Sequence, residues 1–130
     1  MTTRASGPFE VKLTPLTTDD PKLGRMSIDK QFHGDLEATS KGEMLAAMTE
    51  VSGSAGYVAM ERVTGALHGR AGTFVLQHNA TMTRGTPQQN VIVVPDSGTG
   101  ALAGLSGQMI IHIEDRKHSY DFDYQLPPTP

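Results

Sequence analysis

The sequence contains no cysteine, no excess of positive charge and no long apolar run. Without cysteine, the protein cannot form disulfide bonds, cysteine-based metal sites or a catalytic thiolate, and this composition fits a reducing compartment. No apolar run approaches the roughly 20 residues that cross a membrane as a helix. The N-terminal segment MTTRASGPFEV lacks the apolar core of a secretory signal. We therefore expect a cytoplasmic protein with no membrane partner.

The balance of charge limits the choice of other partners. The chain has a formal net charge of -3 at pH 7. Proteins that bind nucleic acids present basic patches, and those that bind single strands interleave them with aromatic residues. Neither pattern occurs in this sequence, so we expect no nucleic-acid partner.

The length and composition favour one β-rich domain. A chain of 130 residues fits a single domain. Its 14 glycines and 8 prolines, together with many threonines, valines and isoleucines, are typical of a protein with many strands and turns. The start of the chain is small and polar, and the PPTP at its end cannot join a β-ladder. We expect flexible ends at residues 1–7 and 127–130, and one domain over residues 8–126.

Apolar and polar residues alternate with a period of two along most of the chain, which indicates β-strands. The alternation is clearest in HSYDFDYQL, where polar residues separate Tyr120, Phe122 and Tyr124. The segment KGEMLAAMTEV, residues 41–51, competes as a helix because of its composition. It is short and lies between strand-like segments, and we interpret it as a strand.

A glycine-containing pattern occurs three times, starting at Gly34, Gly65 and Gly100. Each copy has a glycine, a leucine two residues later, and a further glycine that precedes an apolar residue. We interpret the copies as three related hairpins in which glycine supplies a positive φ. Successive hairpins predict a single antiparallel up-and-down β-barrel, in which closure removes the exposed strand edges.

The third copy lies in VIVVPDSGTGALAGLSGQM, residues 91–109, which superficially resembles a dinucleotide-binding loop. Such a loop requires a helix after the glycines, because the phosphate sits at the helix N-terminus. A strand-like segment follows here instead, and the Gly-Lys-Ser/Thr of a P-loop is absent. We expect a turn and no cofactor.

The segment PDSGTGALAGLSGQM resembles the glycine-rich strand connection of the allene oxide cyclase and dirigent barrels. The segments FEVKL, RMSIDKQFHGDLEATSKGEML, GSAGYVAMERVTGALHGRAGTFVLQH, VVPDSGTGALAGLSG and HSYDFDY are similar to the bacterial family of the domain of unknown function 3224. This resemblance implies an allene oxide cyclase-like β-barrel of about eight strands, and it implies no known activity. Fold alone does not determine function.

Polar side chains that share a strand face with apolar ones are the candidates for chemistry. Lys30, Glu61 and His78 each occur in phase with apolar residues. If those faces line the barrel, the three side chains converge in an apolar lumen, where burial shifts pKa values toward a range useful for acid–base catalysis. We therefore take them as candidate catalytic residues. The alternative is structural: Lys30 pairs with Glu61, and His78 is a hydrogen-bonded core residue.

A second set of residues is predicted to bind a ligand. Ser97 and Thr99 flank a glycine of the loop, and we expect them at the rim of the barrel. His118 follows a turn and is expected at the barrel mouth. Tyr57 and Tyr120 could offer hydroxyl groups to the lumen, although buried tyrosines commonly serve as packing residues with one satisfied hydroxyl.

The histidines do not show the spacing of a metal site. No pair is separated by three residues, and no compact acidic cluster accompanies them. We expect no metal. The sequence contains five histidines: His33, His68, His78, His112 and His118.

Three hypotheses for function follow. The first is a barrel that binds a small apolar molecule, and the second is an isomerase or cyclase that works without a cofactor. The third is a structural barrel whose lumen is filled by Phe32, Phe74, Tyr120 and Phe122. A ligand-sized cavity in the lumen would favour the first two. A dimer or trimer fits the analogy with the cyclase and dirigent barrels.

Overall fold

The protein folds as a closed antiparallel barrel of eight strands in up-and-down order, each paired with its neighbours in the sequence and β1 with β8. The computed structural model describes residues 2–128. The strands are β1 (Thr3–Leu16), β2 (Leu23–Phe32), β3 (Leu36–Met48), β4 (Ala55–Leu67), β5 (Arg70–Thr83), β6 (Thr86–Val93), β7 (Ser106–Glu114) and β8 (Lys117–Gln125). The predicted single antiparallel up-and-down β-barrel is confirmed, and residues 41–48 are part of a strand, as expected.

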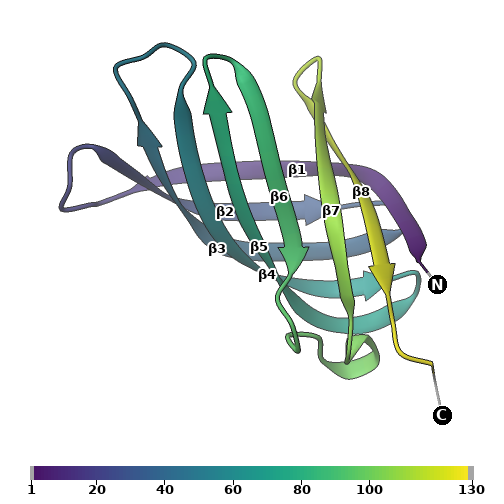
Figure 1. Cartoon of the computed structure of the whole chain (residues 1–130). Helices are drawn as coiled ribbons and strands as arrows, with labels where there is room; N and C mark the ends of the chain where they lie inside the picture. The colour runs from purple at the N-terminus through teal and green to yellow at the C-terminus, as the bar shows by residue number, and fades with distance from the viewer. Residues whose placement is uncertain (1, 129–130) are drawn as a thin grey trace.

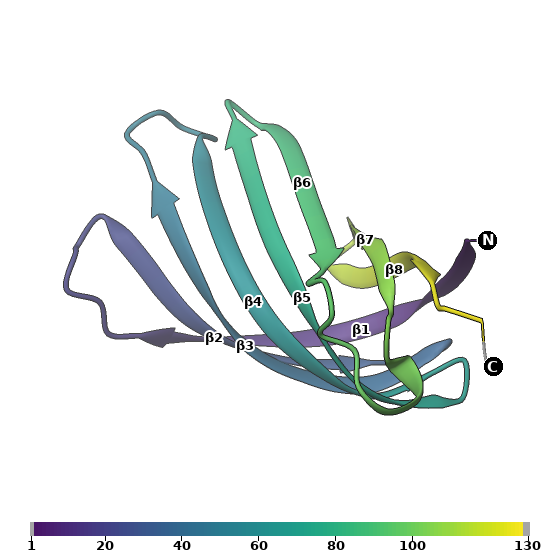
Figure 2. The same cartoon turned by 60° about the horizontal axis from the view of Figure 1, so that its bottom comes forward.

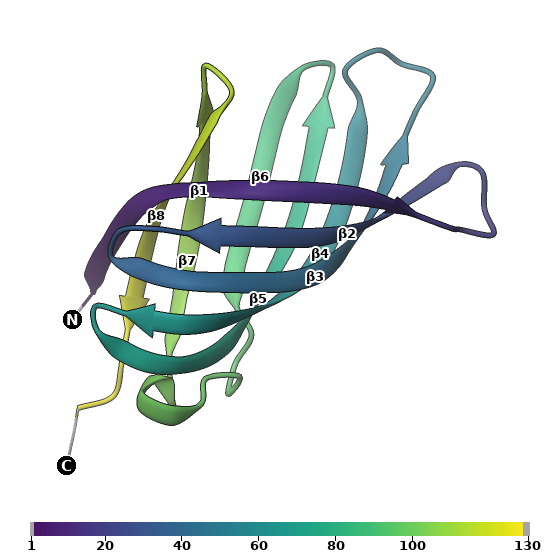
Figure 3. The same ribbon diagram turned by 180° about the vertical axis from the view of Figure 1, so that it is seen from behind.

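The strands are long and strongly curved, so that β1 and β2 run across β6, β7 and β8 on the opposite side of the barrel (Figures 1 and 3). The connections β3–β4, β5–β6 and β7–β8 lie at one end (Figure 1). The connection between β6 and β7 lies at the other end, where it closes over the strands (Figure 2). The two ends of the lumen therefore have different boundaries.

The barrel begins earlier than the sequence predicts. We expected a flexible segment over residues 1–7, but β1 starts at Thr3 and pairs with β8 from Thr3↔Tyr124 to Phe9↔His118. Ala5 is fully buried in the core. Polar residues join the ladder here because main-chain hydrogen bonds do not depend on the side chain. Part of the expected flexible end at residues 127–130 lies outside the described residues.

The expectation of three related hairpins holds for two of the copies, at the β2–β3 and β4–β5 turns, and is wrong for the third. Gly34, with a φ of 92°, lies in the turn between β2 and β3, whereas Gly65 lies within β4 and the following turn is formed by His68 and Gly69. Gly100 opens a short 3-10 helix, η1 (Gly100–Leu102). The same glycine pattern thus serves a turn, a strand and a loop.

The 94–105 loop does not form a hairpin, because β6 and β7 pair only at Ile92↔Gln108 among the described residues. Its residues Leu102 and Leu105 are buried in the core. The loop therefore covers one end of the lumen with apolar side chains.

Candidate functional site

One end of the lumen is packed with aromatic and aliphatic side chains, and we call it the closed end. Phe32, Phe74, Tyr120 and Phe122 are all at most 1% exposed. Phe74 stacks on Phe122 with ring centroids 5.8 Å apart, and Phe32 meets Tyr120 edge to face at 5.6 Å. The four aromatic residues named in the structural hypothesis do fill this half of the barrel.

The opposite end is lined by inward-facing apolar residues that remain in contact with solvent, and we call it the open mouth. The ladder register places Leu13 beside Ile28 and Ile113 beside His118 on the inner face. Nevertheless, Leu13 is 45% exposed, Met82 is 42% exposed and Ile113 is 64% exposed. The open mouth comprises the inward-facing residues Leu13, Met26, Met44, Tyr57, Met82, Ile111, Ile113 and His118.

Four buried polar residues lie between the two ends, and we call them the polar floor: Lys30, Ser40, Glu61 and His78. The carboxylate of Glu61 holds the floor together. Its Oε2 accepts hydrogen bonds from Lys30 Nζ at 2.8 Å and from the His78 ring at 2.6 Å, and its Oε1 accepts one from Ser40 Oγ at 2.9 Å. The structure therefore brings together the three predicted catalytic residues, and the predicted pairing of Lys30 with Glu61 is present.

The floor keeps Glu61 ionised. Burial alone would raise the pKa of this carboxyl group, but the hydrogen bond from His78 and the positive charge of Lys30 outweigh it and lower the pKa to about 2. Because a carboxylate only accepts hydrogen bonds, the ring nitrogen Nε2 of His78 must carry the hydrogen that it shares with Glu61. The tautomer of His78 is thus set by its neighbour.

Gly42 allows the strands to meet closely at the floor. It pairs with Glu61 across β3 and β4. A Cβ atom at this position would overlap the main chain of Met60 and Glu61. The absence of a side chain here therefore allows β3 to lie close to the main chain of β4 at Glu61.

Lys30 also connects the floor with the closed end. Its ammonium group lies 5.0 Å from the centroid of the Phe9 ring and 5.7 Å from that of Phe32. These distances are within the range of cation–π attraction. The lysine is therefore stabilised on two sides, by a carboxylate and by aromatic faces.

Two of the predicted ligand-binding residues lie at the open mouth. The Tyr57 ring is 6.5 Å from the His78 ring, and burial raises the pKa of the Tyr57 hydroxyl. His118 lies next to the β7–β8 turn, with its ring 5.2 Å from that of Phe9. Tyr57 thus lies beside the polar floor, and His118 lies beside Phe9, whose ring is next to Lys30.

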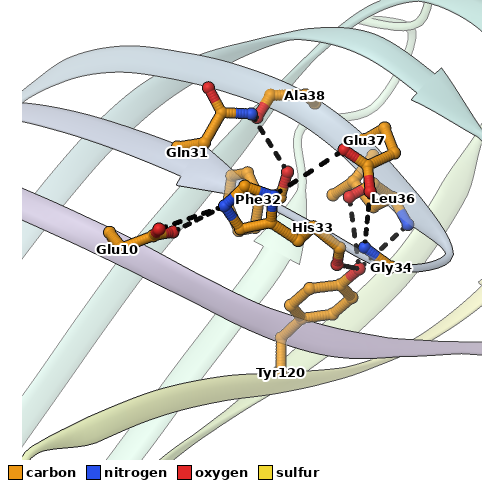
Figure 4. A network of polar contacts seen from close by, with 9 residues as sticks. All are labelled: Glu10, Gln31, Phe32, His33, Gly34, Leu36, Glu37, Ala38 and Tyr120. Carbon is orange, nitrogen blue, oxygen red and sulfur yellow. Dashed lines mark hydrogen bonds and ion pairs between the residues drawn. The ribbon is translucent and has the colours of Figure 1, made fainter.

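Tyr120 lies elsewhere, and its hydroxyl group is occupied. It donates a hydrogen bond to the His33 carbonyl oxygen at 2.7 Å and accepts one from the Leu36 N–H at 2.9 Å (Figure 4). The residue thus ties the β2–β3 turn to β8. We expected Tyr120 to contact a ligand, but its hydroxyl serves this turn because the closed end has main-chain groups that need partners.

Ser97 and Thr99 lie in the 94–105 loop at the closed end, away from the open mouth. Ser97 Oγ accepts the Val75 N–H at 3.0 Å, and Thr99 Oγ1 accepts the Thr73 N–H at 3.0 Å. These hydroxyl groups replace the missing ladder partners of β5. The expected position at a ligand-binding rim is therefore not observed.

Two hollows lie on the outer face of the barrel over β2 to β5. Their volumes are about 580 Å³ and about 350 Å³, and both are lined by Leu45, Val58 and Asn79. These side chains alternate with inward-facing ones and point away from the lumen. The hollows are therefore distinct from the open mouth.

Sequence reasoning missed Ser40, Gly42 and Gln89 as parts of the site. Ser40 lies in phase with Leu36 and Ala38, so an earlier start of β3 in the sequence interpretation would have placed it on the inner face. Gln89 accepts the Ile111 N–H with its side-chain oxygen at 3.3 Å and thereby bridges β6 and β7 near the mouth. The sequence pattern does not predict this bridge, because it depends on the position of β7 relative to β6.

Within residues 2–128, no helix is long and apolar enough to cross a membrane. In the same part of the chain, no group of three or more histidine, aspartate or glutamate residues is arranged to hold a metal ion.

The chain is similar to proteins whose function is unknown. Residues 5–124 match the model of the family described as protein of unknown function DUF3224. A crystal structure of a DUF3224 protein of unknown function from Shewanella oneidensis MR-1 shares 51% sequence identity, with a TM-score of 0.94. The match covers 99% of this chain and 100% of that one. No curated protein matches the chain.

Proposed function

The chain belongs to the DUF3224 family, and we propose that it binds a small, largely apolar molecule in the open mouth of its barrel. The observation that carries this proposal is the exposure of inward-facing apolar side chains at one end only. Ile113 is 64% exposed on the inner face, whereas Phe122, on the same face at the closed end, is fully buried. Burial of exposed apolar surface by a ligand is favourable.

The alternative of a purely structural barrel accounts for the closed end alone. The core aromatics there explain how the barrel is held together. They do not explain why Leu13, Met82 and Ile113 remain uncovered at the other end. An apolar ligand that covers these three side chains explains both ends of the same lumen.

The proposal is tested with the fluorescent apolar probe anilinonaphthalene sulfonate. We expect saturable binding to the folded protein, and we expect Ile113→Glu to weaken it by about tenfold or more because a carboxylate would enter an apolar site. Val58→Glu is the matched control, since Val58 is 55% exposed but lies on the outer face, in both hollows.

The two variants separate the two possible locations. Loss of probe binding in Val58→Glu, with normal binding in Ile113→Glu, would place the ligand in the outer hollows and overturn the proposal. Circular dichroism must show both variants folded. We expect this result because each substitution is at a solvent-exposed position.

A second candidate, a cofactor-independent isomerase, is favoured by one contact. Glu61 accepts the Nε2 hydrogen of His78, which leaves Nδ1 as the atom that could accept a proton from a substrate. The test is the exchange of the α-protons of cyclohexanone in deuterium oxide, followed by NMR. Equal exchange rates for the wild type and His78→Gln would reject this candidate and leave the binding proposal intact.

A further inference from the structure

The second ring nitrogen of His78 faces the lumen. His78 forms one side-chain hydrogen bond, from Nε2 to Glu61. Among residues 2–128, every fully buried side-chain nitrogen or oxygen has a hydrogen-bond partner. Because Nδ1 has no partner among these residues, it is not fully buried. His78 also helps to line the larger outer hollow, but its register on β5, in phase with the inward-facing Leu76 and Met82, directs its side chain toward the lumen.

Lys30 presents a second nitrogen at the same place. Its ammonium group and the His78 ring both donate to Oε2 of Glu61, so the two groups are immediate neighbours. An ammonium group has three hydrogens, and Lys30 Nζ uses one in this hydrogen bond. The charge of Lys30 therefore lies on the Nε2 side of the His78 ring, where Glu61 balances it, while Nδ1 points away from this pair.

The charges around His78 balance while its ring is neutral. From β2, Lys30 contributes one positive charge, and from β4, Glu61 contributes one negative charge. Tyr57, also on β4, remains uncharged because burial raises its pKa. The facing positions on β3 and β6 are occupied by the uncharged residues Met44 and Val91. An anion entering this floor would thus lack a compensating charge, which protonation of His78 would supply.

We propose that the polar floor binds the carboxylate of an apolar acid, and that binding is coupled to the uptake of one proton from solvent by Nδ1 of His78. The cationic imidazole then donates a charge-assisted hydrogen bond from Nδ1 to the carboxylate, while Lys30 and Glu61 keep their own ion pair. No covalent bond of the ligand changes. This inference rests on the proposed function, since the alkyl chain of the acid would occupy the open mouth.

The experiment is isothermal titration calorimetry of the protein with octanoate at about pH 8, where ordinary imidazoles are neutral. The titration is repeated in phosphate and in Tris, whose ionisation enthalpies differ. The difference between the two binding enthalpies, divided by the difference between the ionisation enthalpies of the buffers, gives the number of protons taken up. We expect roughly one proton per bound octanoate, and none for octanol, which carries no charge.

His78→Gln tests the assignment to this residue. We expect it to abolish proton uptake and to weaken octanoate binding about tenfold, with little effect on octanol. The matched control is His112→Gln, because His112 is an exposed histidine bonded to Asp121 on the outer face. Should His78→Gln fail to fold, nitrogen NMR of the wild type replaces it: the His78 ring must change from neutral to cationic when octanoate binds.

The outcomes separate this inference from the function on which it rests. Octanoate binding without proton uptake, or uptake retained in His78→Gln, overturns the carboxylate site and leaves the open mouth as a ligand site. If octanol, octanoate and the fluorescent probe all fail to bind, the proposed function itself is wrong.

Discussion

The closed end and the open mouth are formed by the same eight strands, but their inner faces differ. Phe122 and Ile113 both face inward on adjacent strands, and they are 0% and 64% exposed, respectively. The closed end has a covering loop, stacked aromatic rings and satisfied main-chain groups. The comparison indicates that the closed end carries most of the packing that stabilises the barrel, whereas apolar side chains of the open mouth stay uncovered.

Strand pairing is also uneven around the barrel. β4 and β5 pair without interruption from Ala55↔Met82 to Leu67↔Arg70. β6 and β7 pair at Ile92↔Gln108 alone within residues 2–128, and nearer the mouth a side chain, Gln89, takes over. The seam between β6 and β7 is therefore the part of the barrel that we expect to open most easily.

The largest expected difference concerns apolar side chains. Phe122→Ala should lower the free energy of unfolding by about 3–5 kcal/mol, because it leaves a cavity in a packed core. Ile113→Ala should change it by less than about 0.5 kcal/mol, because that side chain is exposed. Urea denaturation measures both. Similar losses of unfolding free energy in the two variants would show that the closed end does not stabilise the barrel more than the open mouth does.

The next effect is the pH dependence that arises from the polar floor. The pKa of Glu61 is lowered from 4.5 to about 2. Ionised Glu61 therefore stabilises the fold fully at pH values above about 4.5, and this contribution is lost as the pH falls from there to about 2. The shift corresponds to about 3 kcal/mol. We therefore expect the stability advantage of the wild type over Glu61→Gln to shrink as the pH falls from about 5 to about 2.

Urea denaturation at a series of pH values measures this advantage. The other carboxyl groups are common to both proteins, so their titration cancels in the difference. Parallel loss of stability in the wild type and in Glu61→Gln would show that Glu61 does not carry the dependence.

The third comparison is between two tyrosine hydroxyl groups. Tyr120→Phe removes the partner of the His33 carbonyl and the Leu36 N–H, and it should cost about 1–3 kcal/mol. Tyr57→Phe, near the open mouth, should change stability by less than about 0.5 kcal/mol. Thermal unfolding compares the two. Equal effects would mean that Tyr57 has a structural role that its position does not reveal.

The inner face of each strand could be predicted from the sequence, but the end to which each residue belongs could not. The alternation of polar and apolar residues is local, and it correctly placed Lys30, Glu61 and His78 in the lumen together. The level of a residue along the barrel axis depends on register between strands. Tyr120 shows the limit, since its partner Leu36 is 84 positions away in the sequence.

The glycine-rich loop shows a second limit. Glycine permits a positive φ without specifying where the chain goes next. Gly34 leads directly into a paired strand, whereas Gly100 begins a loop that folds over the lumen. The difference comes from contacts with β5 made by Ser97 and Thr99, which extend the pairing of β5 with β6 beyond Val93 and which the glycine pattern does not encode.

The smallest expected effect tests this loop and, with it, the separation of the two ends. Thr99→Val keeps the shape of the side chain but removes the oxygen that accepts the Thr73 N–H. We expect a loss of about 0.5–1.5 kcal/mol in the free energy of unfolding, measured by urea denaturation. Affinity for anilinonaphthalene sulfonate should not change, because the loop and the open mouth lie at opposite ends of the lumen. Ile113→Glu should show the reverse behaviour, with weaker probe binding and little change in stability. If Thr99→Val instead weakens probe binding without affecting stability, the loop belongs to the ligand site, because only direct contact with the ligand would separate affinity from stability in that way.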